Sequence, residues 1–259
     1  MVKWYFIAFA FLLFNIPLSA QQWKLKRMEG VFGIGTTNVY SDLGGAPNAT
    51  SLLFIKDITF RSTRPSVYLG LRYRISPRTS VKTSLIYGYS KTEDFDGSRN
   101  EVRGFSSVTQ LVEFSGNYEY YLLPELRLLR SAAVFNRRGM VNDYSLMGIY
   151  VFAGLGATMY KPELKVEPRE FDEYKTNMGI TAAIPVGAGL KFILSDKWIL
   201  GYEIGYRQSL TDFMDGIKTP WSKRWDGYWI STLNLSYRIP TSRRGLPIFM
   251  DKQWKRARF

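Results

Sequence analysis

Hydrophobic and polar side chains alternate along the chain in repeated segments of about 10 residues. The clearest segment is 67–75, where Val67, Leu69 and Leu71 share one face. The opposite face of this segment carries tyrosine, glycine and two arginines. Because successive side chains of a strand point to opposite sides of a sheet, the alternation predicts a β-strand with one apolar and one polar face.

The same pattern recurs often enough to predict a complete barrel. The polar faces carry many glycines, which weaken the wet face of a soluble sandwich but make room inside a narrow barrel. A single-chain antiparallel barrel in a membrane has an even number of strands. Eight segments follow the pattern, the first less regularly than the others: 30–40, 67–75, 81–89, 108–120, 149–159, 186–192, 198–207 and 232–239.

The connections between these segments alternate in length. Tight turns are predicted at 76–78 and 195–196. Short turns on one side and long polar loops on the other are typical of up-and-down outer-membrane barrels. We therefore predict an all-β fold, an eight-stranded antiparallel up-and-down transmembrane β-barrel of the OmpA/OmpX type. The long polar connections are 41–64, 91–106, 161–181 and 211–227.

One connection departs from this alternation, because 123–147 is long where a short periplasmic turn is expected. Pro124 and Glu125 are suited to begin a helix there. Two interpretations remain open for this insertion, a surface helix at the membrane boundary and a segment that binds a partner.

The N-terminus predicts export. Lys3 precedes an apolar run from Trp4 to Leu18, and small residues follow up to Ala20. The run has the length of a signal-peptide core and is short for a membrane-spanning helix, although an N-terminal anchor is the alternative. We predict a signal peptide over 1–20, a barrel over 21–240 and a periplasmic tail over 241–259. The mature protein would lie in outer-membrane lipid with both termini in the periplasm.

Composition narrows the possible chemistry. The 259 residues include no Cys and no His, which excludes disulfides, thiol catalysis and Ser-His-Asp hydrolysis. We predict no catalytic, cofactor-binding or metal-binding residue and no small-molecule substrate. Two acidic stretches, 93–96 and 212–215, match no EF-hand spacing, and solvated loop charge is the favoured interpretation over a Ca²⁺ site.

Charged residues on the polar faces are predicted to point into the lumen. They indicate either an ion-selective pore or an internal network of ion pairs. An eight-stranded barrel is just wide enough for side chains to fill it, and buried charges persist only when paired, which favours the network. The predicted lumen residues are Arg72, Arg74, Lys82, Glu113, Glu119, Lys191, Glu203, Arg207 and Arg238.

The chain has a formal net charge of +13, and its tail is especially basic. A basic tail with interleaved aromatic residues is compatible with an unstructured tail, a contact with lipid or a protein-docking peptide. A periplasmic location argues against nucleic acid as the partner. The candidate partner-binding residues are Arg243, Arg244, Lys252, Trp254, Lys255, Arg256 and Arg258.

Several motifs, in their order and spacing, resemble the PorG family of outer-membrane barrels from Bacteroidota. The resemblance extends over about residues 29–239, essentially the whole barrel. The motifs are YSDLGG at 40–45, TRP at 63–65, LRYRISPR at 71–78, YVFAGLG at 150–156, GYEIGYR at 201–207 and TDFMD at 211–215.

This resemblance implies a non-enzymatic role in type IX protein secretion. The implied partners are a periplasmic ring lipoprotein like PorK and a periplasmic protein like PorN. A PorT-like accessory barrel of the same machine is a close variant. The alternative is a free-standing small barrel for envelope stability, surface ligand binding or adhesion. A lipid-modifying enzyme is disfavoured by the absence of His.

Overall fold

The computed structural model describes most of the predicted barrel. The signal segment 1–20, the insertion at 125–146 and all seven candidate partner-binding residues of the tail lie outside the described residues. The described residues are 26–40, 62–94, 105–124, 147–165, 173–218, 225–242 and 246–250.

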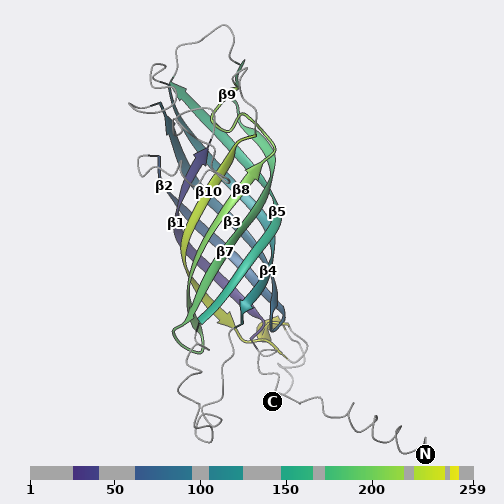
Figure 1. The fold of residues 1–259 in the computed structure, drawn as a ribbon. Helices are drawn as coiled ribbons and strands as arrows, with labels where there is room; N and C mark the ends of the chain where they lie inside the picture. The colour runs from purple at the N-terminus through teal and green to yellow at the C-terminus, as the bar shows by residue number, and fades with distance from the viewer. Residues whose placement is uncertain are drawn as a thin grey trace, which may run out of the picture. The chain divides into compact units, whose positions relative to one another are not determined.

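Eight long strands form a closed antiparallel barrel, which confirms the predicted fold (Figure 1). Each strand pairs with its neighbours along the chain, and the last strand pairs with the first. The strands are β1 (Met28–Tyr40), β2 (Arg64–Ser76), β3 (Thr79–Glu93), β4 (Ser106–Leu123), β5 (Met147–Lys165), β7 (Gly179–Ile193), β8 (Trp198–Ser209) and β10 (Gly227–Ile239).

Two short strands and one short helix complete the described structure. The strands β6 (Glu173–Tyr174) and β9 (Ile217–Lys218) pair with each other and form a separate two-stranded sheet. The 3-10 helix η6 (Ile248–Met250) belongs to a second compact unit, which contains 240–259 and is distinct from the barrel unit Arg27–Ile239. No helix among the residues described is long and apolar enough to cross a membrane.

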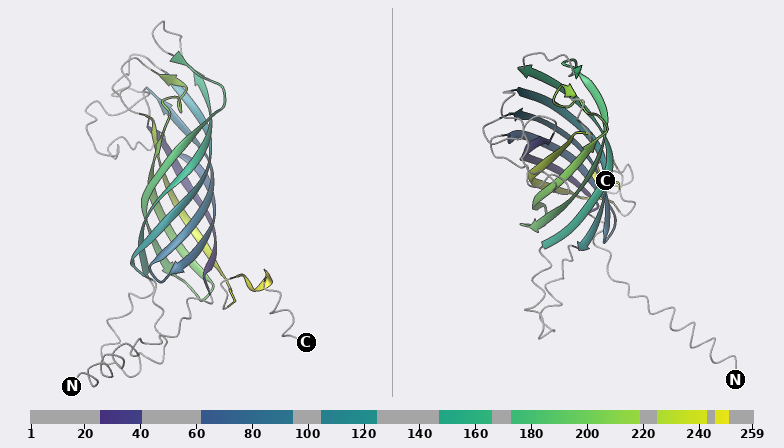
Figure 2. Two further views of the ribbon diagram at one scale, coloured as in Figure 1. Left: turned by 90° about the vertical axis from the view of Figure 1, so that its right-hand side faces the viewer. Right: turned by 45° about the horizontal axis from the view of Figure 1, so that its top comes forward.

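The barrel has two ends of different character (Figure 2). The tight turns β2–β3 and β7–β8 lie at one end, which we name the turn end, together with the start of β1 and the finish of β10. The connections that follow β1, β3, β5 and β8 lie at the opposite end, the loop end. Strands β1 and β10 pair without interruption from Met28↔Ile239 to Tyr40↔Gly227, so their contact closes the wall along its full height.

The strands extend further toward the loop end than predicted. β3 reaches Glu93, β5 reaches Lys165 and β7 begins at Gly179, so parts of the predicted loops 91–106 and 161–181 belong to the wall. The alternation continues there, but on β3 and β5 charged residues replace apolar ones on the outward face, whereas Ile180 on β7 is still apolar. That change of outward residue type made the ends of β3 and β5 look like polar loops.

The outward face of the barrel is apolar, as in barrels that span a membrane. Ile34 and Leu155, for example, are 69% and 73% exposed. Soluble monomers rarely expose a contiguous apolar belt of this kind, whereas lipid accommodates it. Many further large side chains on the same face are exposed, among them Phe32, Val67, Leu69, Leu71, Leu85, Phe114, Ile180, Phe192, Leu233 and Leu235.

Two aromatic pairs mark the edges of this belt on strands β8 and β10. The rings of Trp198 and Tyr237 are 4.9 Å apart near the turn end, and those of Tyr206 and Trp229 are 5.7 Å apart nearer the loop end. Aromatic girdles flank the apolar band of outer-membrane barrels. A separation of eight residues along tilted strands corresponds to a band height of about 20 Å, close to the ~25 Å of such barrels.

Candidate functional site in the barrel lumen

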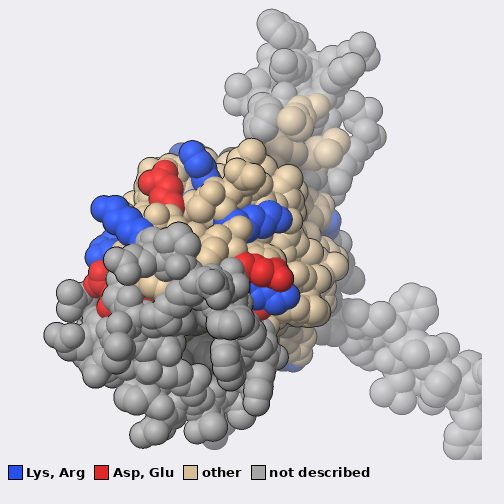
Figure 3. Space-filling model, turned by 90° about the horizontal axis from the view of Figure 1, so that it is seen from above, with Lys and Arg blue, Asp and Glu red and all other residues tan. Residues whose placement is uncertain are grey.

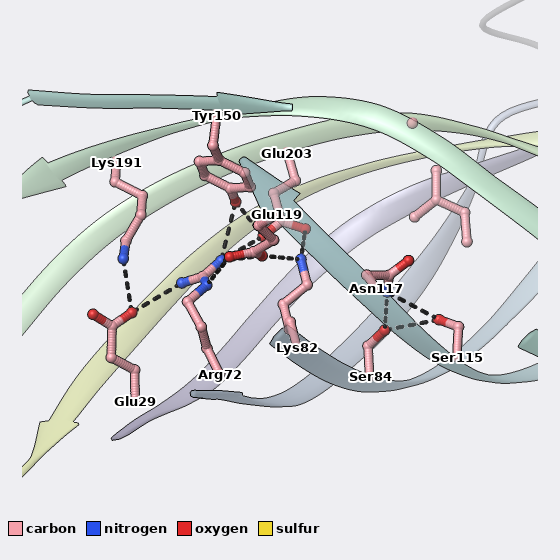
Figure 4. Close-up of polar contacts among 12 residues, drawn as sticks. Glu29, Arg72, Lys82, Ser84, Ser115, Asn117, Glu119, Tyr150, Lys191 and Glu203 are labelled. Carbon is pink, nitrogen blue, oxygen red and sulfur yellow. Dashed lines mark hydrogen bonds and ion pairs between the residues drawn. The ribbon is translucent and has the colours of Figure 1, made fainter. Parts of the chain in front are cut away.

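The turn-end half of the lumen is filled by a network of buried charges drawn from different strands (Figure 4). Arg72 on β2 lies at its centre. Its Nε donates to Glu119 on β4 at 2.7 Å, its Nη1 to Glu29 on β1 at 3.0 Å and its Nη2 to Glu203 on β8 at 3.1 Å. One guanidinium therefore joins three carboxylates from three strands.

A second cation closes the network from β3. Lys82 Nζ donates to Glu203 Oε2 at 2.6 Å and lies 3.2 Å from Glu119 Oε1. The hydroxyl of Tyr150 on β5 donates to Glu203 Oε1 at 2.5 Å and accepts from Arg72 Nη2 at 3.1 Å. Glu203 is thus held by two cations and one hydroxyl, which satisfies a carboxylate that is almost entirely buried.

Glu29 organises the part of the network nearest the turn end. Lys191 Nζ donates to its Oε2 at 2.7 Å. Arg74 Nη2 and Arg238 Nε approach its Oε1 at 3.9 and 3.8 Å. Four cations therefore surround this one carboxylate, since Arg72 also contacts it.

A polar layer lies between this network and the loop end. Ser84 and Ser115 share a hydrogen bond of 2.9 Å, and Asn117 Nδ2 donates to Ser84 Oγ at 3.3 Å. Next to this layer, Glu113 accepts from Ser115 Oγ and lies 3.5 Å from Arg207 Nε. The interior of the wall is thus polar well beyond the central network.

The loop-end half of the lumen is filled in another way. Met214 is fully buried in an apolar cluster with wall residues such as Val39, Leu111 and Ile230. Residue 214 belongs to the connection between β8 and β10, so this connection enters the barrel mouth. We name residues 210–216 the plug segment.

Hydrogen bonds fix the plug segment to the wall and to the base of its own loop. Thr109 Oγ1 on β4 donates to the Met214 carbonyl at 2.8 Å. The Met214 N–H donates to Asp226 Oδ2 at 2.8 Å, and Ser209 Oγ donates to the Asp226 carbonyl at 2.7 Å. The N–H and the carbonyl of Met214 are therefore both hydrogen-bonded to protein side chains.

The plug segment corrects two predictions. Part of the predicted polar loop 211–227 is packed inside the mouth rather than solvated. Asp215, predicted to be solvated loop charge, is fully buried, and its Oδ1 accepts from the Ile217 N–H at 3.0 Å. The physical reason is that Asp215 caps the turn that follows Met214, so its carboxylate accepts a hydrogen bond from the local backbone.

The structure places all nine predicted lumen residues in the barrel interior, where each is at most 7% exposed. It groups most of them at the turn end, whereas Glu113 and Arg207 form a separate pair nearer the loop end. Sequence reasoning missed Glu29, because the predicted first strand began at Gly30 whereas β1 begins at Met28. The sequence pattern that places Glu29 in the lumen was present, since position 29 continues the inward alternation of Val31 and Gly33.

The other acidic stretch, 93–96, is described only in part. Glu93 forms an ion pair with Lys91 on the outward face of β3. Within the described ranges, no group of three or more acidic side chains is placed to hold a metal ion. The ionisable groups of the lumen instead hold one another, an arrangement that can fix the relative positions of strands.

The comparisons with known proteins find one family model. A family model described as "Domain of unknown function (DUF6089)" matches residues 6–236. No curated protein matches the chain.

The solved structures that match share little sequence with this chain. Neisserial surface protein A has a TM-score of 0.44 and 10% identity, with 82% of this chain and 96% of that chain covered. The N-terminal barrel domain of Pseudomonas aeruginosa OprF has a TM-score of 0.42 and 10% identity, with 82% and 97% covered. Ail of Yersinia pestis has a TM-score of 0.41 and 12% identity, with 83% and 99% covered.

Proposed function

This chain belongs to the DUF6089 family, and we propose that it is a non-enzymatic outer-membrane barrel that contacts the periplasmic ring of a type IX protein secretion machine. The proposed partners are outer-membrane lipid, a ring lipoprotein like PorK and a periplasmic protein like PorN. The turn end, where β1 begins and β10 finishes, would then face the periplasm.

The observation that carries this proposal is the filling of the lumen at two levels. An ion-paired network occupies the turn-end half, and the plug segment occupies the mouth at the loop end. A solute channel needs a continuous wet passage, and a lipid-modifying enzyme needs a group that activates a nucleophile. A filled barrel whose ionisable groups bind one another supports a structural, anchoring role instead.

The type IX assignment rests on the resemblance to the PorG family. The motifs behind it contain the side chains that fill the lumen: Arg72 lies in 71–78, Tyr150 in 150–156 and Glu203 in 201–207. Met214 lies in the motif 211–215. The resemblance therefore involves the residues that make this barrel a solid support, in addition to its lipid-facing surface.

The deciding experiment is an affinity pull-down of the tagged protein from mildly solubilised outer membranes, followed by mass spectrometry. Recovery of a ring lipoprotein and its periplasmic partner supports the proposal. Recovery of the barrel alone, with ring components present and soluble in the same extract, contradicts it.

The basic tail provides a test of which segment makes the contact. We expect replacement of its six basic residues by Ser to weaken recovery of the ring, with circular dichroism of the barrel unchanged. Unchanged recovery would remove the tail from the contact. The replaced residues are Arg243, Arg244, Lys252, Lys255, Arg256 and Arg258.

The alternative function is that of a free-standing barrel which binds ligands at the cell surface. The observation in its favour is an ordered element above the mouth, where Lys175 and Lys218 lie 5.7 and 5.8 Å from the ring centroid of Phe213. Lys218 belongs to β9 of the small sheet, and Lys175 directly follows β6 of the same sheet. Under this alternative, deletion of the gene leaves secretion intact and changes surface adhesion.

A further inference from the structure

The two ends of the barrel differ in charge. Among the described barrel residues, the turn-end half contains eight basic and four acidic side chains, a net charge of +4. The loop-end half contains seven basic and eight acidic side chains, a net charge of −1. Viewed from the loop end, described basic and acidic side chains are interspersed (Figure 3). The turn-end residues are Arg27, Glu29, Arg72, Arg74, Arg78, Lys82, Glu119, Lys191, Asp196, Lys197, Glu203 and Arg238.

The count at the loop end shows that the asymmetry does not come from an excess of basic over acidic side chains throughout the barrel. Its basic residues are matched by acidic residues on the same strand ends and connections. The residues counted there are Arg64, Lys91, Glu93, Asp94, Glu113, Lys161, Glu163, Lys165, Glu173, Lys175, Arg207, Asp212, Asp215, Lys218 and Asp226.

The turn end presents its positive charge from a fixed rim. Arg78 and Lys197 are exposed in the two tight turns. The carbonyl of Arg78 accepts from the Tyr121 N–H at 2.8 Å, and the carbonyl of Lys197 accepts from the Arg238 N–H at 2.8 Å. Each turn is therefore tied to the neighbouring strand, which fixes the backbone that carries these two charges.

Further positive charge lies just inside this rim. Arg74, Lys191 and Arg238 all point toward Glu29 and lie in the interior of the wall. Lipid headgroups surround the outside of a barrel, so they reach the rim but not side chains that face the lumen. A protein segment that lies across the turn end can contact the rim charges directly, while the nearly buried interior cations act on it only through their electrostatic field.

We propose that the turn end of the barrel is a docking surface for an acidic segment of a partner protein. Carboxylates of that segment would pair with Arg78 and Lys197 and would also be attracted by the interior cations of the turn end. Arginine and carboxylate form strong charge-assisted hydrogen bonds, and long-range attraction speeds encounter. The identification of this partner with the secretion ring rests on the proposed function. The charge asymmetry is independent of that function.

The test uses the full mature chain in detergent micelles and a fluorescently labelled decaglutamate peptide as the probe. The turn-end variant carries Arg78→Glu and Lys197→Glu. The matched control carries Lys161→Glu and Lys165→Glu, which make the same change in net charge on exposed loop-end positions. We expect the turn-end variant to bind about tenfold more weakly, with the control within about twofold of the unchanged protein.

Three outcomes overturn the proposal. The first is unchanged peptide binding by the turn-end variant, and the second is an equal loss in the loop-end control. The third is displacement of the peptide by phosphatidylglycerol, with the binding of the lipid, and not that of the peptide, dependent on Arg78 and Lys197. This result would assign the rim to lipid. Circular dichroism of each variant verifies that the barrel is folded.

The same variants separate this inference from the proposed function. Ring recovery that persists in the turn-end variant, together with lost peptide binding, contradicts docking of the ring at this surface while leaving the secretion role intact. Peptide binding that depends on the rim, in a protein that recovers no ring component, contradicts the secretion role and retains the docking surface.

Discussion

The two halves of the lumen are both filled by side chains, but by side chains of different chemical type. The turn-end half is filled by paired charges around Arg72, whereas the loop-end half is filled by apolar side chains around Met214. A buried ion pair contributes little net stability when intact but is costly when one partner is removed. An apolar filling loses stability in proportion to the cavity that a deletion creates. The two halves should therefore respond differently to single substitutions.

The largest effect is expected from Arg72→Met. This change removes the cation shared by three carboxylates and leaves them buried with fewer partners. We expect a loss of about 3–5 kcal/mol in the free energy of unfolding, measured by urea titration in lipid vesicles. Arg78→Met, at an exposed arginine of the turn, serves as the control and should change it by less than about 0.5 kcal/mol. Equal losses in the two variants would refute the special role of the network.

Met214→Ala tests the apolar half. Removal of a fully buried methionine side chain leaves a cavity at the barrel mouth, and we expect a loss of about 2–3 kcal/mol in the free energy of unfolding. The value lies at the lower end of the usual range because the plug segment can settle into the space. Met178→Ala, at a methionine that is 68% exposed, is the control. A loss at Met214 greater than that of Arg72→Met would reverse the comparison.

Gly189→Ala tests how tightly the charged half is packed. A Cβ at position 189 would collide with the ring of Tyr150, whose hydroxyl donates to Glu203. We expect a destabilisation of about 1–3 kcal/mol, since the ring must move and its hydrogen bonds must lengthen. Gly116→Ala is a matched control, because a Cβ there meets nothing within 4 Å. Thermal unfolding of both variants in the same vesicles decides whether the crowding is real.

The smallest effect is expected from Thr109→Val. This change removes the hydroxyl that donates to the Met214 carbonyl and nearly preserves side-chain volume. We expect a loss of about 1 kcal/mol, together with faster hydrogen exchange at the Met214 amide as the plug segment loosens. Protection at that amide identical to the unchanged protein would show that Asp226 alone holds the segment in place.

Much of this fold could be predicted from sequence because a lipid-facing barrel imposes a strict two-residue period. The inward direction of Arg72 and Glu203 follows directly from that period. The pairing of those residues does not, because it depends on which strands face each other across the lumen. The burial of Met214 was hidden for another reason: it lies in a polar connection without periodicity, and its position is set by hydrogen bonds to Thr109 and Asp226.

The pairing of β1 with β10 also determines when the barrel can be completed. The first strand has no partner on one side until the last strand has been synthesised and brought back to it. Glu29 meets Lys191 and Arg238 only at that stage, so these two ion pairs are acquired together with closure. Contacts between residues so distant in sequence make folding slow, and the growing wall keeps two open edges in the meantime. The folding chain is therefore most exposed to strand mispairing during the interval before its final strand arrives.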